Sequence, residues 1–172
     1  MKKFAEIFKN KKYLVITICV MTLLLIGWLV VGSLNIKPPQ LYLSSEFSET
    51  VQAISGGYSW SNWHESVIAD SIHPTEFQYT PGNTLTVGRN EQIILSNKKV
   101  KIDRRYPFEL SSLECFDKNN IVVTGYKVSP IYINGDLYID APAVNGVCVC
   151  SVVLKYKQGT VSYGYKLIVV NE

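Results

Sequence analysis

Residues 56–74, GGYSWSNWHESVIADSIHP, contain both histidines of the chain, two of its three tryptophans and two carboxylates. Two histidines and a carboxylate can hold a zinc ion with one position left open for a substrate. The groups here would be His64, Glu65, Asp70 and His73, in the order H-E-x-x-x-x-D-x-x-H. This spacing matches no ligand arrangement that a short hairpin supports, and no H-E-x-x-H motif occurs. We therefore predict no metal and no cofactor.

Other catalytic motifs give no stronger signal. A serine nucleophile on a strand-to-helix elbow would need G-x-S-x-G, which does not occur. A catalytic cysteine would need a histidine nearby, and Cys148 and Cys150 lie on a face whose pattern indicates core. Carboxylate pairs carry no information in a segment with thirteen acids. We predict that the protein is not an enzyme and keep an envelope hydrolase as the least favoured alternative.

The aromatic residues of the same stretch suggest a binding surface. Tyr58, Trp60 and Trp63 could present amphipathic area to a glycan, a peptide or a partner protein of the cell envelope, and Asp70 lies beside them. The structural alternative is that Trp60 packs in the core while Asp70 caps a turn. Trp63 and Trp60 fall on opposite faces of a strand, so one should be exposed, and we favour Trp63.

Three cysteines follow the first forty residues, which allows at most one bridge within the chain. Cys148 and Cys150 would lie side by side on one strand face, a poor geometry for a bridge between them. Cys115 can bridge to either one. The alternative, which we favour, is that all three are small buried hydrophobic residues. A zinc site would need a fourth ligand and C-x-x-C spacing, which the C-V-C pair lacks.

The elements that would position these residues are strands. The stretch 131–139, IYINGDLYI, has Asn-Gly between two alternating runs and predicts a hairpin with a type I′ turn. In residues 146–170 two alternating runs flank a turn at 157–160, with Cys148, Cys150 and three further even positions facing the core. We predict a mainly β protein with an immunoglobulin-like β-sandwich over 81–172 and a β extension over 41–80, which carries a G-x-Y-x-W hairpin.

The first forty residues predict a membrane anchor. Residues 13–34 form a predicted transmembrane helix, because no charge occurs from Tyr13 to Gly32 and about twenty helical residues span a bilayer core. Residues 1–12 are lysine-rich and predict a cytoplasmic tail, which places the domain outside the cell membrane. Residues 35–40, with two prolines, form a linker. The alternative is a cleaved signal peptide, whose apolar core would be shorter.

Charge argues against a nucleic-acid partner. The whole chain has a formal net charge of +3, but the lysine tail supplies the excess. From Lys37 onward twelve Lys and Arg residues face thirteen Asp and Glu residues. Phosphate backbones need clustered positive charge, so we predict no nucleic-acid binding.

The spacing of several of these residues resembles a known group. The pattern G-x-Y-x-W followed by A-D-S-x-x-P is similar to a segment of uncharacterised membrane-anchored or lipid-anchored extracytoplasmic β-domain proteins of low-GC Gram-positive bacteria. Those proteins end in a strand, a Lys-x-Gly turn and a Tyr-rich strand. The matching residues here are Gly56, Tyr58, Trp60, Ala69, Asp70, Ser71, Pro74, Lys157, Gly159, Tyr163 and Tyr165. The resemblance implies location and a β fold but no activity, and the Cys148/Cys150 pair departs from it.

Together these features predict a single-pass membrane protein that presents a non-catalytic binding or sensing domain at the cell envelope. Twelve residues are too few for a folded output domain in the cytoplasm. An accessory subunit of a membrane complex is therefore the main alternative.

Overall fold

In the part of the chain that the structure describes, a long helix precedes a β domain. The computed structural model describes residues 11–33, 37–46, 48–61, 66–70, 72–97, 106–123 and 129–171, with side chains described for residues 13–28 of the helix. The alternation in residues 100–103, VKID, also predicts a strand, and it lies outside the described residues. Between the described ends the chain is mainly β, which confirms the predicted fold class at this level.

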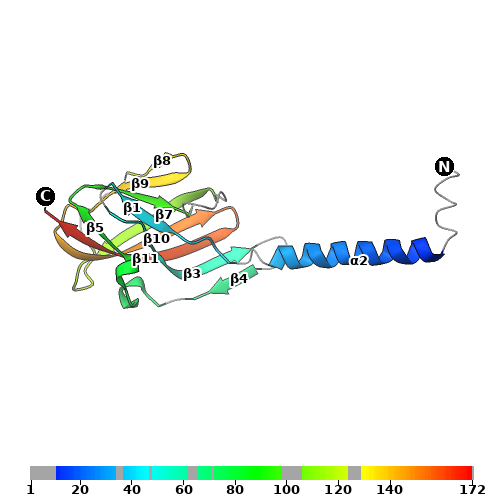
Figure 1. Ribbon diagram of the computed structural model, residues 1–172. Helices are drawn as coiled ribbons and strands as arrows, with labels where there is room; N and C mark the ends of the chain where they lie inside the picture. The colour runs from blue at the N-terminus through cyan, green and yellow to red at the C-terminus, as the bar shows by residue number, and fades with distance from the viewer. Residues whose placement is uncertain are drawn as a thin grey trace.

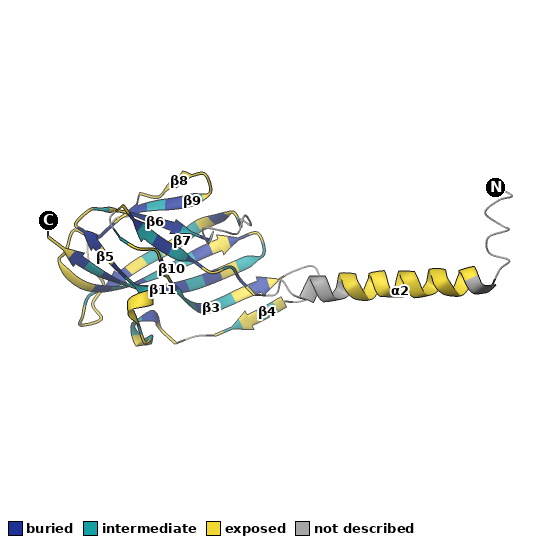
Figure 2. Ribbon diagram, viewed as in Figure 1, coloured by how far each residue is buried: buried dark blue, intermediate teal, exposed yellow. Residues whose placement is uncertain are grey.

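Helix α2 (Lys11–Ser33) extends away from the β domain (Figure 1). Every described side chain of this helix, from Tyr13 to Trp28, is exposed (Figure 2). The prediction of a helix here is confirmed. No helix in the part of the chain that the structure describes is long and apolar enough to cross a membrane. The structure thus does not support the predicted membrane span at 13–34.

Two sheets form the domain. The first has the strand order β2-β1-β6-β9-β8. Its strands are β1 (Tyr42–Ser45), β2 (Val51–Gln52), β6 (Gln92–Ser96), β8 (Ile131–Ile133) and β9 (Asp136–Asp140).

The second sheet has the order β4-β3-β11-β10-β7, and β5 pairs in parallel with the last part of β11. All other strand pairs in both sheets are antiparallel. The strands of this sheet are β3 (Ile54–Ser61), β4 (Ser66–Ala69), β5 (Thr84–Gly88), β7 (Phe108–Phe116), β10 (Gly146–Tyr156) and β11 (Gly159–Val170). Two short 3-10 helices, η1 (Pro74–Glu76) and η2 (Pro81–Asn83), lie between β4 and β5.

The two predicted hairpins are present. Asn134 and Gly135 join β8 to β9 with φ values of 52° and 83°, as a type I′ turn requires. β10 pairs with β11 from Gly146↔Val169 to Tyr156↔Gly159, so the turn contains Lys157 and Gln158. Side chains at even positions of β10 and odd positions of β11 are buried, as the alternation predicts.

One apolar core lies between the sheets. The first sheet contributes alternate residues of its central strands, among them Leu43, Ile93 and Leu137, and the second contributes the inner faces of β10 and β11. Because each sheet has one buried face, the alternating sequence decides which side chains point inward.

Residues 41–80 add strands to both sheets. β1 pairs with β6, and β2 extends that sheet beyond β1. β3 pairs with β11, and β4 lies outside it as the second arm of a hairpin. The extension therefore adds one hairpin to the edge of each sheet.

Candidate functional site

The predicted aromatic stretch forms the β3–β4 hairpin. The side chains of this hairpin do not form the single binding surface that the sequence suggested. Trp60 is 2% exposed and packs edge-on against Tyr156 and Tyr106, with ring centroids 5.3 Å and 6.3 Å apart. Its position opposite Gly159 on β11 places it on the inner face. The indole therefore offers no surface for binding, in agreement with the structural alternative.

The remaining predicted binding residues are divided. Tyr58 is half-buried and packs against the core, whereas Asp70 is exposed at the end of β4. Both line a shallow hollow of about 450 Å³ on the outer face of the second sheet, together with His73. Trp63 lies outside the described residues, as do His64 and Glu65.

His73 in this hollow has a structural role. Its Nδ1 accepts a hydrogen bond from the Thr75 backbone N–H at 3.4 Å, at the start of η1. Its ring packs edge-on against Phe116, with the centroids 5.0 Å apart. Among the described residues no three His, Cys, Asp or Glu side chains lie close enough to hold a metal ion.

The cysteines contribute one bridge. Cys115 on β7 and Cys150 on β10 are directly opposite in the ladder and are joined by a disulfide. Cys148 is a buried free thiol. The interpretation of all three as unbridged hydrophobic residues, which the sequence favoured, is wrong for two of them. The alternative of a bridge from Cys115 to one member of the pair agrees with the structure.

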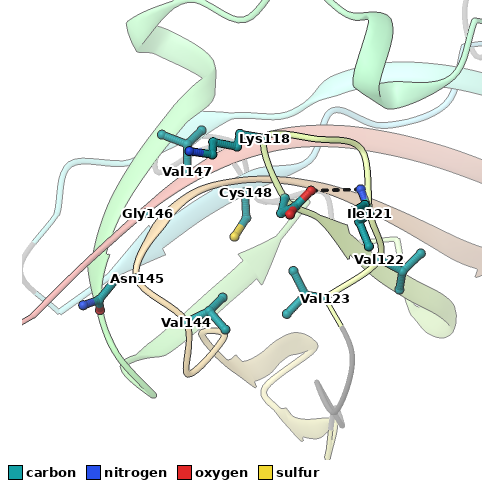
Figure 3. Close-up of a pocket in the computed structure, with 10 residues that line it drawn as sticks. Lys118, Ile121, Val122, Val123, Val144, Asn145, Gly146, Val147 and Cys148 are labelled. Atoms are coloured by element: carbon teal, nitrogen blue, oxygen red, sulfur yellow. Dashed lines mark hydrogen bonds between the residues drawn. The ribbon is translucent and has the colours of Figure 1, made fainter.

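Cys148 lines a pocket that the sequence did not predict. A pocket of about 480 Å³ lies between the segment after β7 and the segment that leads into β10 (Figure 3). The Cys148 sulfur points into the space between Val123 and Val144. The residues that line the pocket are Asp117, Lys118, Ile121, Val122, Val123, Val144, Asn145, Gly146, Val147 and Cys148.

The wall after β7 is held by Asp117. Its Oδ1 accepts the backbone N–H groups of Asn119 at 2.8 Å and Ile121 at 2.9 Å. The Ile121 hydrogen bond is the main cause that lowers the pKa of this exposed carboxyl group. Phe116 and Val122 then form an isolated antiparallel β-bridge, and the Val123 N–H donates to the Cys115 carbonyl at 2.8 Å. Asp117 thus turns the chain back against β7.

The chemistry of the pocket depends on the Cys148 thiol and on the side chains around it. Burial raises the pKa of the Cys148 thiol, and the nearby Asp117 carboxylate raises it further. A thiol with a raised pKa is a weak nucleophile at neutral pH. Aliphatic side chains form most of the remaining wall, and four of them are also exposed at the surface: Ile121, Val122, Val144 and Val147. Asp117, Lys118 and Asn145 add polar groups to this wall, so the lining offers both apolar and polar contacts to a ligand.

Local sequence carried little signal for this pocket. Its two walls are separated by more than twenty residues and meet only because β7 pairs with β10.

Comparison of the chain with protein-family models, with curated proteins and with solved structures finds no match.

Proposed function

We propose that the chain is a single-pass membrane protein whose β domain binds a ligand at the outer face of the cell membrane. The uncharged run from Tyr13 to Gly32 supports the anchor, and it belongs to helix α2. The run includes residues 29–32, whose side chains lie outside the described part of the chain. The lysines of the tail support a cytoplasmic N-terminus.

The disulfide supports the location of the domain. Disulfides persist in oxidising compartments and are rare in the cytoplasm. The Cys115–Cys150 bridge joins two strands of the domain itself. A cell-surface position is consistent with this bond.

Strand order supports an immunoglobulin-like arrangement for residues 81–172. The orders β6-β9-β8 and β11-β10-β7 correspond to the B-E-D and G-F-C sheets of such domains. The Cys115–Cys150 bridge departs from this pattern because it joins neighbouring strands of one sheet instead of the two sheets.

The observation that carries the binding proposal is the position of the pocket. The chain enters the domain beside the β10–β11 turn, where the Tyr163 hydroxyl donates to the Pro39 carbonyl at 2.7 Å. The pocket lies at the opposite end, where β10 begins and β11 ends (Figure 1). A domain anchored from α2 would therefore present the pocket away from the membrane.

A pair of matched variants tests the proposal. Val144 lines the pocket and is 40% exposed, whereas Val170 is 42% exposed at the same end and does not line it. We expect Val144→Arg to reduce capture of envelope material by the purified full chain about tenfold, because the long charged side chain would fill part of the pocket. Val170→Arg should leave capture unchanged. Equal capture by both variants and the original chain would contradict the pocket as the binding site.

A further inference from the structure

The described charges are distributed unequally between the two ends of the domain. At the end beside the β10–β11 turn, called here the anchor end, the described charged residues are Lys37, Lys155, Lys157, Glu109 and Asp136. The opposite end carries Glu46, Glu49, Arg89, Glu91, Asp117, Lys118 and Asp140. Among the described residues the anchor end therefore has three lysines against two acids, and the opposite end has five acids against two basic residues.

The lysines at the anchor end surround a hollow. A depression of about 420 Å³ is lined by Glu109, Lys155 and Lys157 with the edges of Pro107, Phe108 and Tyr156. Lys155 lies opposite Glu109 in the β7–β10 ladder, so a carboxylate faces it. Lys157 lies in the turn, beyond the last residue pair of the β10–β11 ladder, so it has no cross-strand partner among the strands that the structure describes.

The connection to α2 keeps this end near the helix. Pro38 is buried in the domain, and Pro39 accepts the hydrogen bond from Tyr163. Residues 34–37 separate Ser33 of α2 from Pro38, and the five Cα-to-Cα steps between them span at most about 18 Å. Electrostatic attraction to a charged surface acts over about 8–10 Å at physiological salt, so a short connection is needed for the anchor end to come within its range.

From this arrangement we infer that the anchor end binds the surface of an anionic phospholipid membrane through Lys155 and Lys157. The inference rests on the proposed anchor. Charge complementarity supports it, because phospholipid phosphates would meet the lysines while the acidic end points away. Contact through this end also holds the pocket at the opposite end clear of the lipid.

The test uses the full chain reconstituted in phosphatidylcholine vesicles, with or without phosphatidylglycerol. A membrane-impermeant acetylating reagent modifies exposed lysines, and mass spectrometry gives the rate at each one. We expect phosphatidylglycerol to slow acetylation of Lys157 about fivefold, and high salt to restore the rate. Lys118, at the opposite end, is the internal control and should react at one rate in both vesicles.

Two variants sharpen the test. Lys157→Gln should remove most of the protection of Lys155, whereas Lys118→Gln should not change it. Equal rates at Lys157 in both kinds of vesicle, or equal slowing at Lys118, would overturn the inference. Flotation of the chain with the vesicles tests the anchor separately. If the chain floats with the vesicles but Lys157 is not protected, only this inference is contradicted. If the chain does not float, the proposed anchor is contradicted as well.

Discussion

Among the glycines whose surroundings the structure describes, Gly159 leaves the least room for a side chain. It opens β11 with φ +154° and lies opposite Trp60 on β3. A Cβ atom here would lie 1.9 Å from the Ser59 carbonyl oxygen and 2.8 Å from its carbon. Glycine therefore allows β3 to approach β11 closely enough for Trp60 to enter the core.

Gly159→Ala should consequently lower the free energy of unfolding by at least about 2 kcal/mol, since the clash is with backbone that cannot rotate away. Gly82→Ala is the matched control, because its Cβ would meet only the Thr80 hydroxyl at 3.7 Å. That variant should stay within about 0.5 kcal/mol of the original chain. Urea denaturation followed by tryptophan fluorescence measures both, and a Gly159→Ala chain as stable as the control would contradict the close approach.

For single residues, the sequence predicted which strand face is buried but not which residue lies opposite on the neighbouring strand. Alternation placed Cys148 and Cys150 on the buried side correctly. It could not show that Cys115 lies opposite Cys150, because that contact depends on the register between β7 and β10. The same limit applied to Trp60, whose buried position depends on its pairing with β11.

At the scale of elements, the C-terminal hairpin joins the domain to its entry segment through buried phenols. The Tyr156 and Tyr163 hydroxyls lie 3.3 Å apart, and Tyr163 also donates to Pro39. Burial is the main cause that raises the pKa of Tyr156 to about 12, and it raises the pKa of Tyr163 further. The folded protein therefore keeps both phenols protonated in moderately alkaline solution.

Stability should fall as pH rises through the range in which only the unfolded chain loses these protons. A free phenol has a pKa of about 10, so the loss begins there and continues toward about 12. Each buried tyrosine should cost about 1 kcal/mol one pH unit above 10. Urea denaturation at several pH values measures this decrease, and Tyr156→Phe should make it shallower. A flat profile above pH 10 for the original chain would contradict the buried network.

Local signals predicted some elements well. The two hairpins were predictable because turn chemistry and alternation agree within about ten residues. Strand β7 was not predicted, since its exposed positions include Ser111, Ser112 and Glu114 and its pattern is irregular. A register shift where it pairs with Val153 and Leu154 contributes to that irregularity. The parallel pair between β5 and β11 joins segments about eighty residues apart, and no local pattern encodes it.

For the whole molecule, the account joins a helix of exposed apolar residues to a disulfide-bonded β domain. The domain has a basic end beside the helix connection and a pocket at the other end. If the helix anchors the chain, the basic end faces the membrane and the pocket faces away from it. The location of the domain outside the cell is thus the claim on which the proposed function depends.

Labelling of intact cells with a membrane-impermeant amine reagent tests this claim most directly. The account predicts that Lys118 and Lys166 react in intact cells, that Lys2 and Lys3 react only after the cells are opened, and that the full chain sediments with the membranes. Labelling of the tail while the domain stays protected would contradict it, as would full-length chain recovered from the cytosol.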